Sequence, residues 1–230
     1  MKNLDLVILA GGKGSRIKKY LKNKPKPMMR FNRIYFLRYL INMYSKYPIN
    51  NIYILCGFKH KVIFKNFNNK TFNFVKVKCI KENNLMGTGG ALYKLKKEKL
   101  NDFILINGDT IFEFDLMDLV KSLKLKKIGS IALTHNRKNT NSFKLNKLGI
   151  KNSNIFLTNK NKLMNGGVYF FKRKILNYIT KSKCSLENDI LPKLIKKNKI
   201  SGRLYKSFFL DIGTPKYLKK SVKALKKKFK

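Results

Sequence analysis

The sequence predicts an α/β fold in which a mostly parallel sheet is covered by helices on both faces. Two nearly continuous apolar runs, Leu4 to Ala10 and Phe103 to Asn107, each stop abruptly before a glycine, as buried parallel strands do. Through the first half, such runs alternate with stretches of apolar residues at helical spacing, as in βαβ units. The second half is less regular. These features predict a Rossmann-like, three-layer fold with a small insertion in its second half.

The remaining elements are expected in a regular order. Pro48 ends the first helix, and Thr214 as N-cap with Pro215 begins the last one. Residues 136–163 are rich in Asn and Lys and are expected to form hairpins or an insertion beside the sheet. Further strands are expected at Asn51–Cys56, Phe74–Ile80, Ser130–Thr134 and Gly167–Phe171, and helices at Ile34–Tyr47, Gly87–Lys97, Leu116–Leu125, Ser185–Lys197 and Thr214–Lys228.

The charge balance is extreme, with 53 Lys and Arg against 11 Asp and Glu in 230 residues, a formal net charge of +42. Such a charge attracts polyanions, so a nucleic-acid or membrane-surface function is one interpretation. The other is a compositional bias toward AT-rich codons, because most lysines are dispersed and no nucleic-acid-reading motif accompanies them. Since carboxylates are so scarce, each one is a candidate for a task that lysine cannot perform.

The cysteines and histidines do not form a metal or disulfide pattern. Three cysteines lie far apart without a CxxC pair, which indicates reduced thiols, and two isolated histidines do not suggest a zinc site. A strand-like run begins almost at the N-terminus, and no apolar run approaches the ~20 residues of a membrane span. The sequence therefore predicts a cytoplasmic protein that does not enter a membrane, with no zinc.

A glycine-rich loop, Leu9-Ala10-Gly11-Gly12-Lys13-Gly14-Ser15-Arg16, directly follows the first strand. Glycines allow a tight turn and bring backbone N–H groups close to an anion. The spacing fits neither a dinucleotide-binding GxGxxG motif nor a P-loop. Arg16 stands where its guanidinium can bind phosphate oxygens in a bidentate manner. A simple strand-to-helix turn is the alternative, but it would not require three glycines and an arginine together.

The segment Lys24-Pro25-Lys26-Pro27-Met28 follows this loop. The two prolines favour an extended backbone that can direct Lys26 into a cleft. In a lysine-rich chain this segment alone is weak evidence of a functional site. Its position directly after the glycine loop strengthens that interpretation.

Together, LAGGKGSR and PKPM closely resemble the signature of the sugar-phosphate nucleotidyltransferases, LAGGxGTRL followed by PKPM. Ser15 replaces the usual Thr and Ile17 the usual Leu. The other landmarks of that family follow in order across nearly the whole chain. They are Glu82 with Leu85-Met86-Gly87-Thr88-Gly89-Gly90-Ala91, Asn107-Gly108-Asp109, Asn165-Gly166-Gly167-Val168-Tyr169, Ser185-Leu186-Glu187-Asn188-Asp189 and Asp211-Ile212-Gly213-Thr214-Pro215.

The resemblance implies a role for each landmark. Lys26 and Arg16 would be catalytic, with Lys26 neutralising charge on the transferred α-phosphate and Arg16, beside Ser15, binding the β- and γ-phosphates. Asp109 and Asp211 would hold Mg²⁺, which is commonly bound by one or two carboxylates plus phosphates. The nucleotide would be held by Leu9, Ala10, Gly11, Gly12, Gly14, Ser15, Glu82, Gly87 and Thr88, and the sugar phosphate by Gly108, Lys160, Gly166, Gly167 and Glu187.

Several of these roles have structural alternatives. Asp109 alone could be a turn-forming residue after glycine, and Gly166-Gly167 alone could be a β-turn. If the first four strands take the order 3-2-1-4, Asp109 and the glycine loop leave adjacent strands at the reversal point, where ligands of such sheets bind. The family places a lysine within Glu-Lys before NGG, whereas this chain has Asn159-Lys160-Asn161-Lys162. Lys160 is the first choice, Lys162 is possible, and a solvated lysine is the alternative.

The resemblance implies one nucleotidyltransferase domain, 1–230, with a nucleotide-binding half at about 1–125 and a sugar-phosphate-binding half at about 126–230. The expected reaction joins an NMP from an NTP to a sugar 1-phosphate and releases pyrophosphate. GTGGA and NGGVY in a compact chain are most similar to D-glycero-α-D-manno-heptose 1-phosphate guanylyltransferases, which places GTP and a heptose or hexose 1-phosphate first. The alternatives are a mannose- or glucose-1-phosphate enzyme with another NTP, transfer to a non-sugar phosphate, and a non-enzymatic polyanion or nucleic-acid binder. No specific nucleic-acid partner is expected, and a homo-oligomer stays open.

Overall fold

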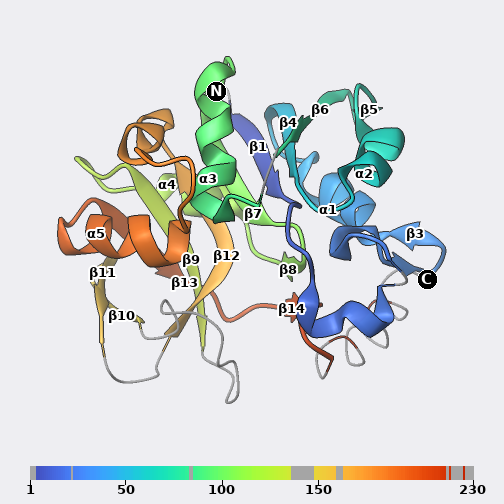
Figure 1. Ribbon diagram of the computed structural model, residues 1–230. Helices are drawn as coiled ribbons and strands as arrows, with labels where there is room; N and C mark the ends of the chain where they lie inside the picture. The colour runs from blue at the N-terminus through green and yellow to red at the C-terminus, as the bar shows by residue number, and fades with distance from the viewer. Residues whose placement is uncertain are drawn as a thin grey trace. The chain divides into compact units, whose positions relative to one another are not determined.

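The structure is a computed structural model that describes residues 4–21, 23–82, 85–135, 148–158 and 163–215, with Leu218 and Leu225. The chain divides into two units, which we call unit one and unit two (Figure 1). The chain passes between the units after Leu85, inside β7 (Asp102–Asn107), inside β8 (Thr110–Phe112) and after Phe208. Unit one contains Met1–Leu85, Ile106–Ile111 and Phe209–Lys230, and unit two contains Met86–Leu105 and Phe112–Phe208.

Unit one contains a sheet whose strands run in the order β1-β4-β6-β5. β1 pairs with β4 and β4 with β6 in parallel, and only β5 is antiparallel to its neighbour. The first three strands thus have the expected order 3-2-1. Their bounds are β1 Leu4–Leu9, β4 Ile49–Cys56, β5 Thr71–Phe72 and β6 Val75–Lys81.

Burial along these strands follows the sequence pattern. β1, which is apolar apart from Asp5, is buried on both faces except at its last residue, Leu9. In β6, Val75, Val77 and Cys79 are buried while Lys76 and Lys78 are exposed. The expectation of a sheet covered on both faces therefore fails at β6, where alternation leaves one face in solvent.

The helices of unit one are short. An amphipathic α1 follows a small antiparallel hairpin of β2 and β3, and α2 lies between β4 and β6 in the chain. Unit one also contains β14, which pairs with β8. The bounds are η1 Ser15–Tyr20, η2 Lys26–Met28, β2 Arg30–Phe31, β3 Ile34–Tyr35, α1 Phe36–Tyr44, α2 His60–Phe67 and β14 Phe209–Asp211.

Unit two contains a mixed sheet with the order β10-β11-β13-β9-β12. β13 and β9 are parallel, whereas β12 is antiparallel to β9 and β10 is antiparallel to β11. A register shift between Asn165 and Tyr169 breaks the pairing of β12 with β9. The bounds are β9 Gly129–His135, β10 Leu148–Lys151, β11 Asn154–Leu157, β12 Leu163–Phe171 and β13 Ile200–Leu204.

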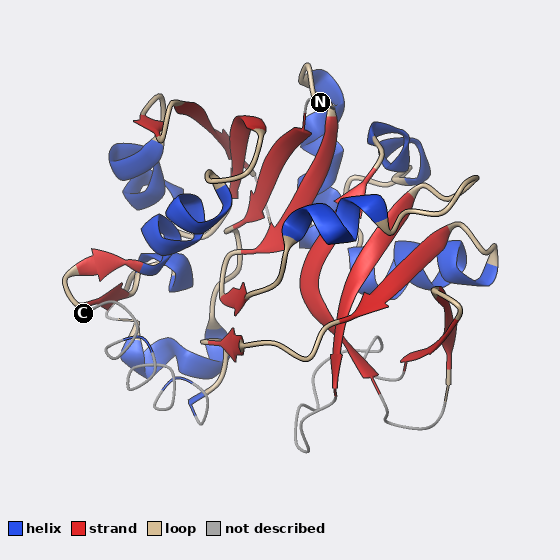
Figure 2. Cartoon of the chain, turned by 180° about the vertical axis from the view of Figure 1, so that it is seen from behind, coloured by secondary structure: helices blue, strands red, loops and turns tan. Residues whose placement is uncertain are grey.

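Helical segments accompany these strands in unit two (Figure 2). Ser185 begins one of them by accepting a hydrogen bond from the Asn188 N–H through its side chain. The bounds are α3 Gly87–Tyr93, η3 Lys94–Lys97, α4 Leu116–Lys121, η5 Arg173–Tyr178, a π-helical turn η6 at Leu186–Ile190, and α5 Leu191–Lys196.

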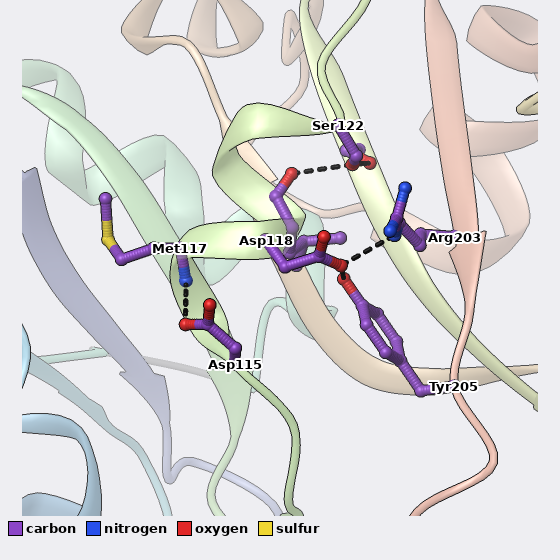
Figure 3. A network of polar contacts seen from close by, with 8 residues as sticks. Asp115, Met117, Asp118, Ser122, Arg203 and Tyr205 are labelled. Carbon is purple, nitrogen blue, oxygen red and sulfur yellow. Dashed lines mark hydrogen bonds and ion pairs between the residues drawn. The ribbon is translucent and has the colours of Figure 1, made fainter.

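A polar network fixes α4 to β13 (Figure 3). Asp115 caps α4 by accepting from the Met117 N–H at 3.0 Å. Asp118 accepts from the Tyr205 hydroxyl at 2.7 Å and pairs with Arg203 Nε at 2.6 Å. The Tyr205 ring stacks on Phe114 with centroids 4.0 Å apart. These contacts lie within unit two, and they give Asp118 a structural role in joining α4 to the end of β13.

Several expected boundaries are wrong for local reasons. The helix expected at Ile34–Tyr47 begins at Phe36, because Ile34 and Tyr35 pair with the preceding strand. The helix expected at Ser185–Lys197 is a π turn followed by α5, since Pro192 lacks the N–H that a continuous α-helix requires. The expected hairpin in residues 136–163 is present as β10–β11 within the described residues.

Candidate functional site

The glycine loop of unit one is tied to the strand beside it. The Ala10 N–H donates to the Leu55 carbonyl at 2.9 Å, and Gly11 O accepts from the Phe58 N–H at 3.0 Å. A Cβ on Gly57 would lie 2.7 Å from Gly11 O, so the two chain segments can approach this closely only because residue 57 is glycine. A Cβ on Gly11 would meet Glu82 Cδ at 3.1 Å, which places the buried Glu82 side chain beside the loop.

Two other glycines of the loop differ in their surroundings. Gly14 has φ +65°, in the left-handed region, and directly precedes η1. A Cβ on Gly12 would meet no atom within 4 Å. The backbone therefore requires glycine at position 14, whereas the packing of unit one does not require it at position 12.

Lys26 is held by a proline-flanked turn. Pro25 is extended, at φ −60° and ψ 147°, and Lys26 starts the short turn η2, which ends at the fully buried Met28. The expectation of an extended backbone is thus correct at Pro25 and wrong at Lys26. The reason is that Pro27 suits an early turn position, where its fixed φ fits and no donor is needed.

Three charged side chains of unit one meet at Gly213. The Lys26 ammonium donates to Asp109 Oδ2 at 2.6 Å. Asp211 Oδ1 accepts from the Gly213 N–H at 2.5 Å. A Cβ on Gly213 would lie 2.7 Å from Asp211 Oδ1 and 3.3 Å from both Asp109 Oδ2 and Lys26 Nζ. Only glycine leaves room for these three side chains together.

Asp109 reaches this position through a close backbone contact. The Gly108 N–H donates to the Leu9 carbonyl at 2.9 Å, and a Cβ on Gly108 would lie 2.5 Å from that oxygen. The Ile212 N–H in turn donates to the Asp109 carbonyl at 3.0 Å. The Asn-Gly-Asp and Asp-Ile-Gly motifs are therefore joined by backbone bonds, and the end of β1 lies beside them.

The two carboxylates have opposite shifts in pKa. Burial would raise the pKa of Asp109, but the charge and hydrogen bond of Lys26, with contributions from Thr110 and Arg16, hold it below its usual value. Burial, followed by the charge of Asp109, raises the pKa of Asp211 to about 6, against the Gly213 N–H and the charges of Lys26 and Arg16. The second carboxylate is therefore ionised only at the cost of repulsion from the first.

This arrangement fits a hard divalent cation. A carboxylate whose pKa is raised by a neighbouring carboxylate, as Asp211 is by Asp109, gains from an added positive charge between the two. Two oxygen-donor side chains are also the usual protein contribution to a cation that is otherwise bound by phosphates and water. Within the described residues no cluster of three or more His, Cys, Asp or Glu exists that could form a site made by the protein alone.

In unit two, the GTGG segment packs against the segment around Cys184. The N–H groups of Gly89 and Gly90 donate to the Cys184 carbonyl at 3.0 and 3.1 Å. Gly87 has φ +76°, and a Cβ there would lie 2.5 Å from the same oxygen. This packing brings Thr88 to Glu187, whose Oε2 accepts from the Thr88 hydroxyl at 2.5 Å.

The NGGVY motif forms an irregular stretch of β12. Gly167 has φ +72° and its N–H donates to Asn165 Oδ1 at 2.9 Å. A Cβ on Gly166 would lie 2.4 Å from the Phe112 ring. Gly166 thus has a packing reason and Gly167 a backbone reason within unit two, although both lie in a strand and not in the β-turn considered as an alternative.

The predicted site residues therefore fall into two described groups. Lys160 and its alternative Lys162 lie outside the described residues. Unit two contains Gly87, Thr88, Gly166, Gly167 and Glu187, of which Thr88 and Glu187 are in direct contact. Unit one contains Leu9, Ala10, Gly11, Gly12, Gly14, Ser15, Arg16, Lys26, Glu82, Gly108, Asp109 and Asp211.

Four residues of these groups were not among the predicted site residues. Gly213 borders the carboxylates of unit one, and Asn165, Tyr169 and Ser185 take part in the polar contacts that lead to Glu187. All four belong to motifs that can be recognised in the sequence, so the motifs could have indicated them. The sequence does not show which of these side chains touch.

One further observation concerns membranes: none of the helices in the described parts of the chain is both long and apolar enough to cross a bilayer.

Known proteins resemble this chain over most of its length. It is 31% identical over 220 residues to a D-glycero-alpha-D-manno-heptose 1-phosphate guanylyltransferase of Campylobacter jejuni, covering 92% of this chain and 96% of that protein. It is also 31% identical over 219 residues to the bifunctional protein GlmU of Methanococcus aeolicus, covering 92% of this chain. The chain spans about half the length, 52%, of that bifunctional relative.

The fold is likewise found in solved structures. The crystal structure of HddC from Yersinia pseudotuberculosis complexed with GMP-PN superposes with a TM-score of 0.78 at 28% identity, covering 100% of both chains. The predicted Rossmann-like α/β fold is thereby confirmed. The model of the nucleotidyl transferase family matches residues 6–228, which confirms the resemblance noted in the motifs. The chain belongs to the nucleotidyl transferase family.

Proposed function

We propose that the protein transfers GMP from GTP to a sugar 1-phosphate, with D-glycero-α-D-manno-heptose 1-phosphate as the first candidate acceptor. The observation that carries this choice is the match with a guanylyltransferase of that name over 96% of the relative's length, against 52% for the bifunctional relative. The guanine nucleotide in the HddC complex supports the same base.

The chemistry proposed for unit one follows from its charges. An oxygen of the sugar phosphate attacks the α-phosphorus of GTP, the bond to the β-phosphate breaks, and pyrophosphate leaves. Lys26 compensates negative charge on the α-phosphate, and Arg16 with Ser15 binds the β- and γ-phosphates. Asp109 and Asp211 hold Mg²⁺, which supplies further charge compensation when bound.

The nucleotide-binding and sugar-binding assignments are also proposals. The open space at Gly12 and the buried Glu82 beside Gly11 support a nucleotide at the glycine loop. Glu187, a nearly buried carboxylate, is a suitable acceptor for a sugar hydroxyl. Because GTP and free thiols both belong to the cytoplasm, we place the reaction there; all three cysteines are free in the structure.

A polyanion-binding function without catalysis is not favoured. The family match covers residues 6–228, and two of only 11 acidic residues converge beside Lys26. The high net charge of +42 is then a surface property of an enzyme.

The test is a panel of the four NTPs against heptose, mannose and glucose 1-phosphates, with pyrophosphate release as the readout. GTP is expected to give the highest kcat/KM, and EDTA should abolish release. A higher kcat/KM with another NTP would overturn the choice of base. No release with any pair, together with RNA binding that weakens steeply with salt, would overturn the enzyme function.

A further inference from the structure

The buried carboxylate of Glu187 in unit two is held by uncharged hydroxyl groups. Glu187 is only 5% exposed. Its Oε2 accepts from Thr88 Oγ1 at 2.5 Å and from Ser185 Oγ at 3.2 Å, and its Oε1 accepts from the Tyr169 hydroxyl at 3.5 Å. In a chain with 53 Lys and Arg, these donors leave the negative charge of the carboxylate uncancelled.

The hydroxyl of Thr88 is fully engaged within the protein. Its oxygen accepts from the Leu186 N–H at 2.9 Å. A backbone N–H can only donate, so the single proton of the hydroxyl is directed to Glu187. Ser185 behaves in the same way, because its oxygen accepts from the Asn188 N–H at 3.1 Å. The same hydroxyls thus connect the backbone at the start of η6 to the Glu187 carboxylate.

Tyr169 supports the other oxygen of Glu187. It is completely buried, and burial followed by the charge of Glu187 raises the pKa of Tyr169 well above its usual value, so it stays a neutral donor. The orientation of Asn165 is set by the Gly167 N–H, which donates to Oδ1. The amide nitrogen of Asn165 therefore donates to the Tyr169 oxygen, at 2.5 Å, and leaves the phenolic proton for Glu187.

A count of acceptor positions shows what remains free. A carboxylate offers about four lone-pair positions. Two on Oε2 are taken by Thr88 and Ser185, and one on Oε1 is taken by Tyr169 at the longest of the three distances. Among the contacts of the described residues, one position on Oε1 is left for a donor from outside the network.

We infer that Thr88 and Tyr169 are positioning residues that present one free lone pair of Glu187 Oε1 to a single hydroxyl group of the acceptor sugar. This inference rests on the proposed function. It gives Thr88 a role toward the sugar, in place of the nucleotide-binding role implied by the family resemblance. It also limits Glu187 to one sugar hydroxyl instead of two.

The first experiment compares Thr88→Val, which keeps the side-chain shape but removes the hydroxyl, with Thr88→Ser, which keeps the hydroxyl. The substrates are GTP and whichever of the three sugar 1-phosphates gives the highest kcat/KM. Thr88→Val should raise the KM for the sugar phosphate about tenfold, the effect of losing a hydrogen bond to a charged group, with the KM for GTP within about twofold of wild type. Thr88→Ser should restore it.

Tyr169→Phe should raise the same KM by a smaller factor, because its hydrogen bond is longer. Tyr39→Phe is the matched control, since Tyr39 is a buried tyrosine of unit one whose hydroxyl donates to the Phe31 carbonyl. It should leave both KM values unchanged. A rise in the KM for GTP in Thr88→Val, or unchanged KM values for both substrates, overturns the inference.

The acceptor count is tested with a set of monodeoxy sugar 1-phosphates. For one of the monodeoxy sugars, the wild type should show a higher KM than for the full sugar. In Thr88→Val, removing that hydroxyl should raise the KM little further, because both changes remove the same interaction. Full additivity at every deoxy position overturns the single-hydroxyl assignment.

A second measurement is independent of any substrate. Without the Thr88 hydroxyl, the buried carboxylate of Glu187 loses its shortest hydrogen bond. Thr88→Val should therefore unfold at a lower urea concentration than Thr88→Ser, which keeps that donor. Equal unfolding midpoints overturn the network, even if no substrate pair reacts and the proposed function itself fails.

Discussion

The carboxylates of unit one and the carboxylate of unit two are held in opposite ways. Asp109 and Asp211 lie beside Lys26, within the influence of Arg16, and the charge of Asp109 raises the pKa of Asp211. Glu187 is held by hydroxyl groups that carry no charge. The first arrangement favours an added cation, and the second favours a neutral hydroxyl donor. We therefore expect a cation at the carboxylates of unit one and a sugar hydroxyl at the carboxylate of unit two.

The largest effect is expected for Asp109→Asn in unit one. Loss of this charge should lower kcat at least ~100-fold, as when a main electrostatic stabiliser of a transition state is removed. Steady-state pyrophosphate release measures it. Asp118→Asn is the control, because that aspartate pairs with Arg203 and Tyr205 in unit two. Near-normal turnover of Asp109→Asn removes Asp109 from the reaction.

Asp211→Asn tests the repulsion between the two carboxylates. The folded-state pKa of Asp211, about 6, lies above the usual value for aspartate. Its contribution to stability is therefore present at low pH and lost as pH rises through about 6.

In metal-free protein at pH 7 to 8, Asp211→Asn should accordingly increase the free energy of unfolding by about 1–3 kcal/mol. The gain should vanish near pH 4. Chemical denaturation in EDTA measures it, and a loss of stability at pH 8 contradicts the assigned repulsion.

Lys26→Gln tests whether the Lys26 ammonium competes with a metal ion for Asp109. Without nucleotide, the variant should bind Mn²⁺ about tenfold more tightly than wild type, since a cation 2.6 Å from the carboxylate has been removed. Electron paramagnetic resonance of free Mn²⁺ gives the affinity. Lys76→Gln, on the exposed face of β6, is the control for net charge. Equal or weaker binding by Lys26→Gln contradicts the competition.

The smallest effects are expected in the glycine loop. Gly12→Ala should change the free energy of unfolding by less than about 0.5 kcal/mol, because its Cβ meets no atom. It should nevertheless raise the KM for GTP about tenfold if the nucleotide fills that space, a loss of ~1.4 kcal/mol. Gly14→Ala, at φ +65°, should instead cost about 1–2 kcal/mol of stability. An unchanged KM for GTP in Gly12→Ala would place the nucleotide elsewhere.

Much of the fold could be predicted from the sequence because its core strands are simple. β1 is apolar apart from Asp5, and it ends shortly before Gly11. The helix α2 was missed, since His60–Phe67 has no side-chain cap and begins after Lys59 in the left-handed region. β13 was missed because five residues with a central Gly202 show little strand pattern.

The candidate site, like the fold, has a part that the sequence predicts and a part that it does not. Motif order was sufficient to select Lys26, Asp109 and Asp211, which the structure brings together in unit one. The partners of Glu187 could not be predicted, because Thr88 lies 99 residues away in the chain. Their contact depends on how the glycines of GTGG pack against Cys184, which only the folded unit determines.

The most direct test of the contrast is to titrate Mg²⁺ and the sugar 1-phosphate separately in Asp109→Asn and Glu187→Gln. The loss in Asp109→Asn should lie in kcat and in the Mg²⁺ dependence, and the loss in Glu187→Gln should lie in the KM for the sugar phosphate. The account is contradicted if both variants change the same parameter, or if Glu187→Gln alters the Mg²⁺ dependence. In either case Asp109 would not be the cation ligand, or Glu187 would not be the acceptor for the sugar hydroxyl.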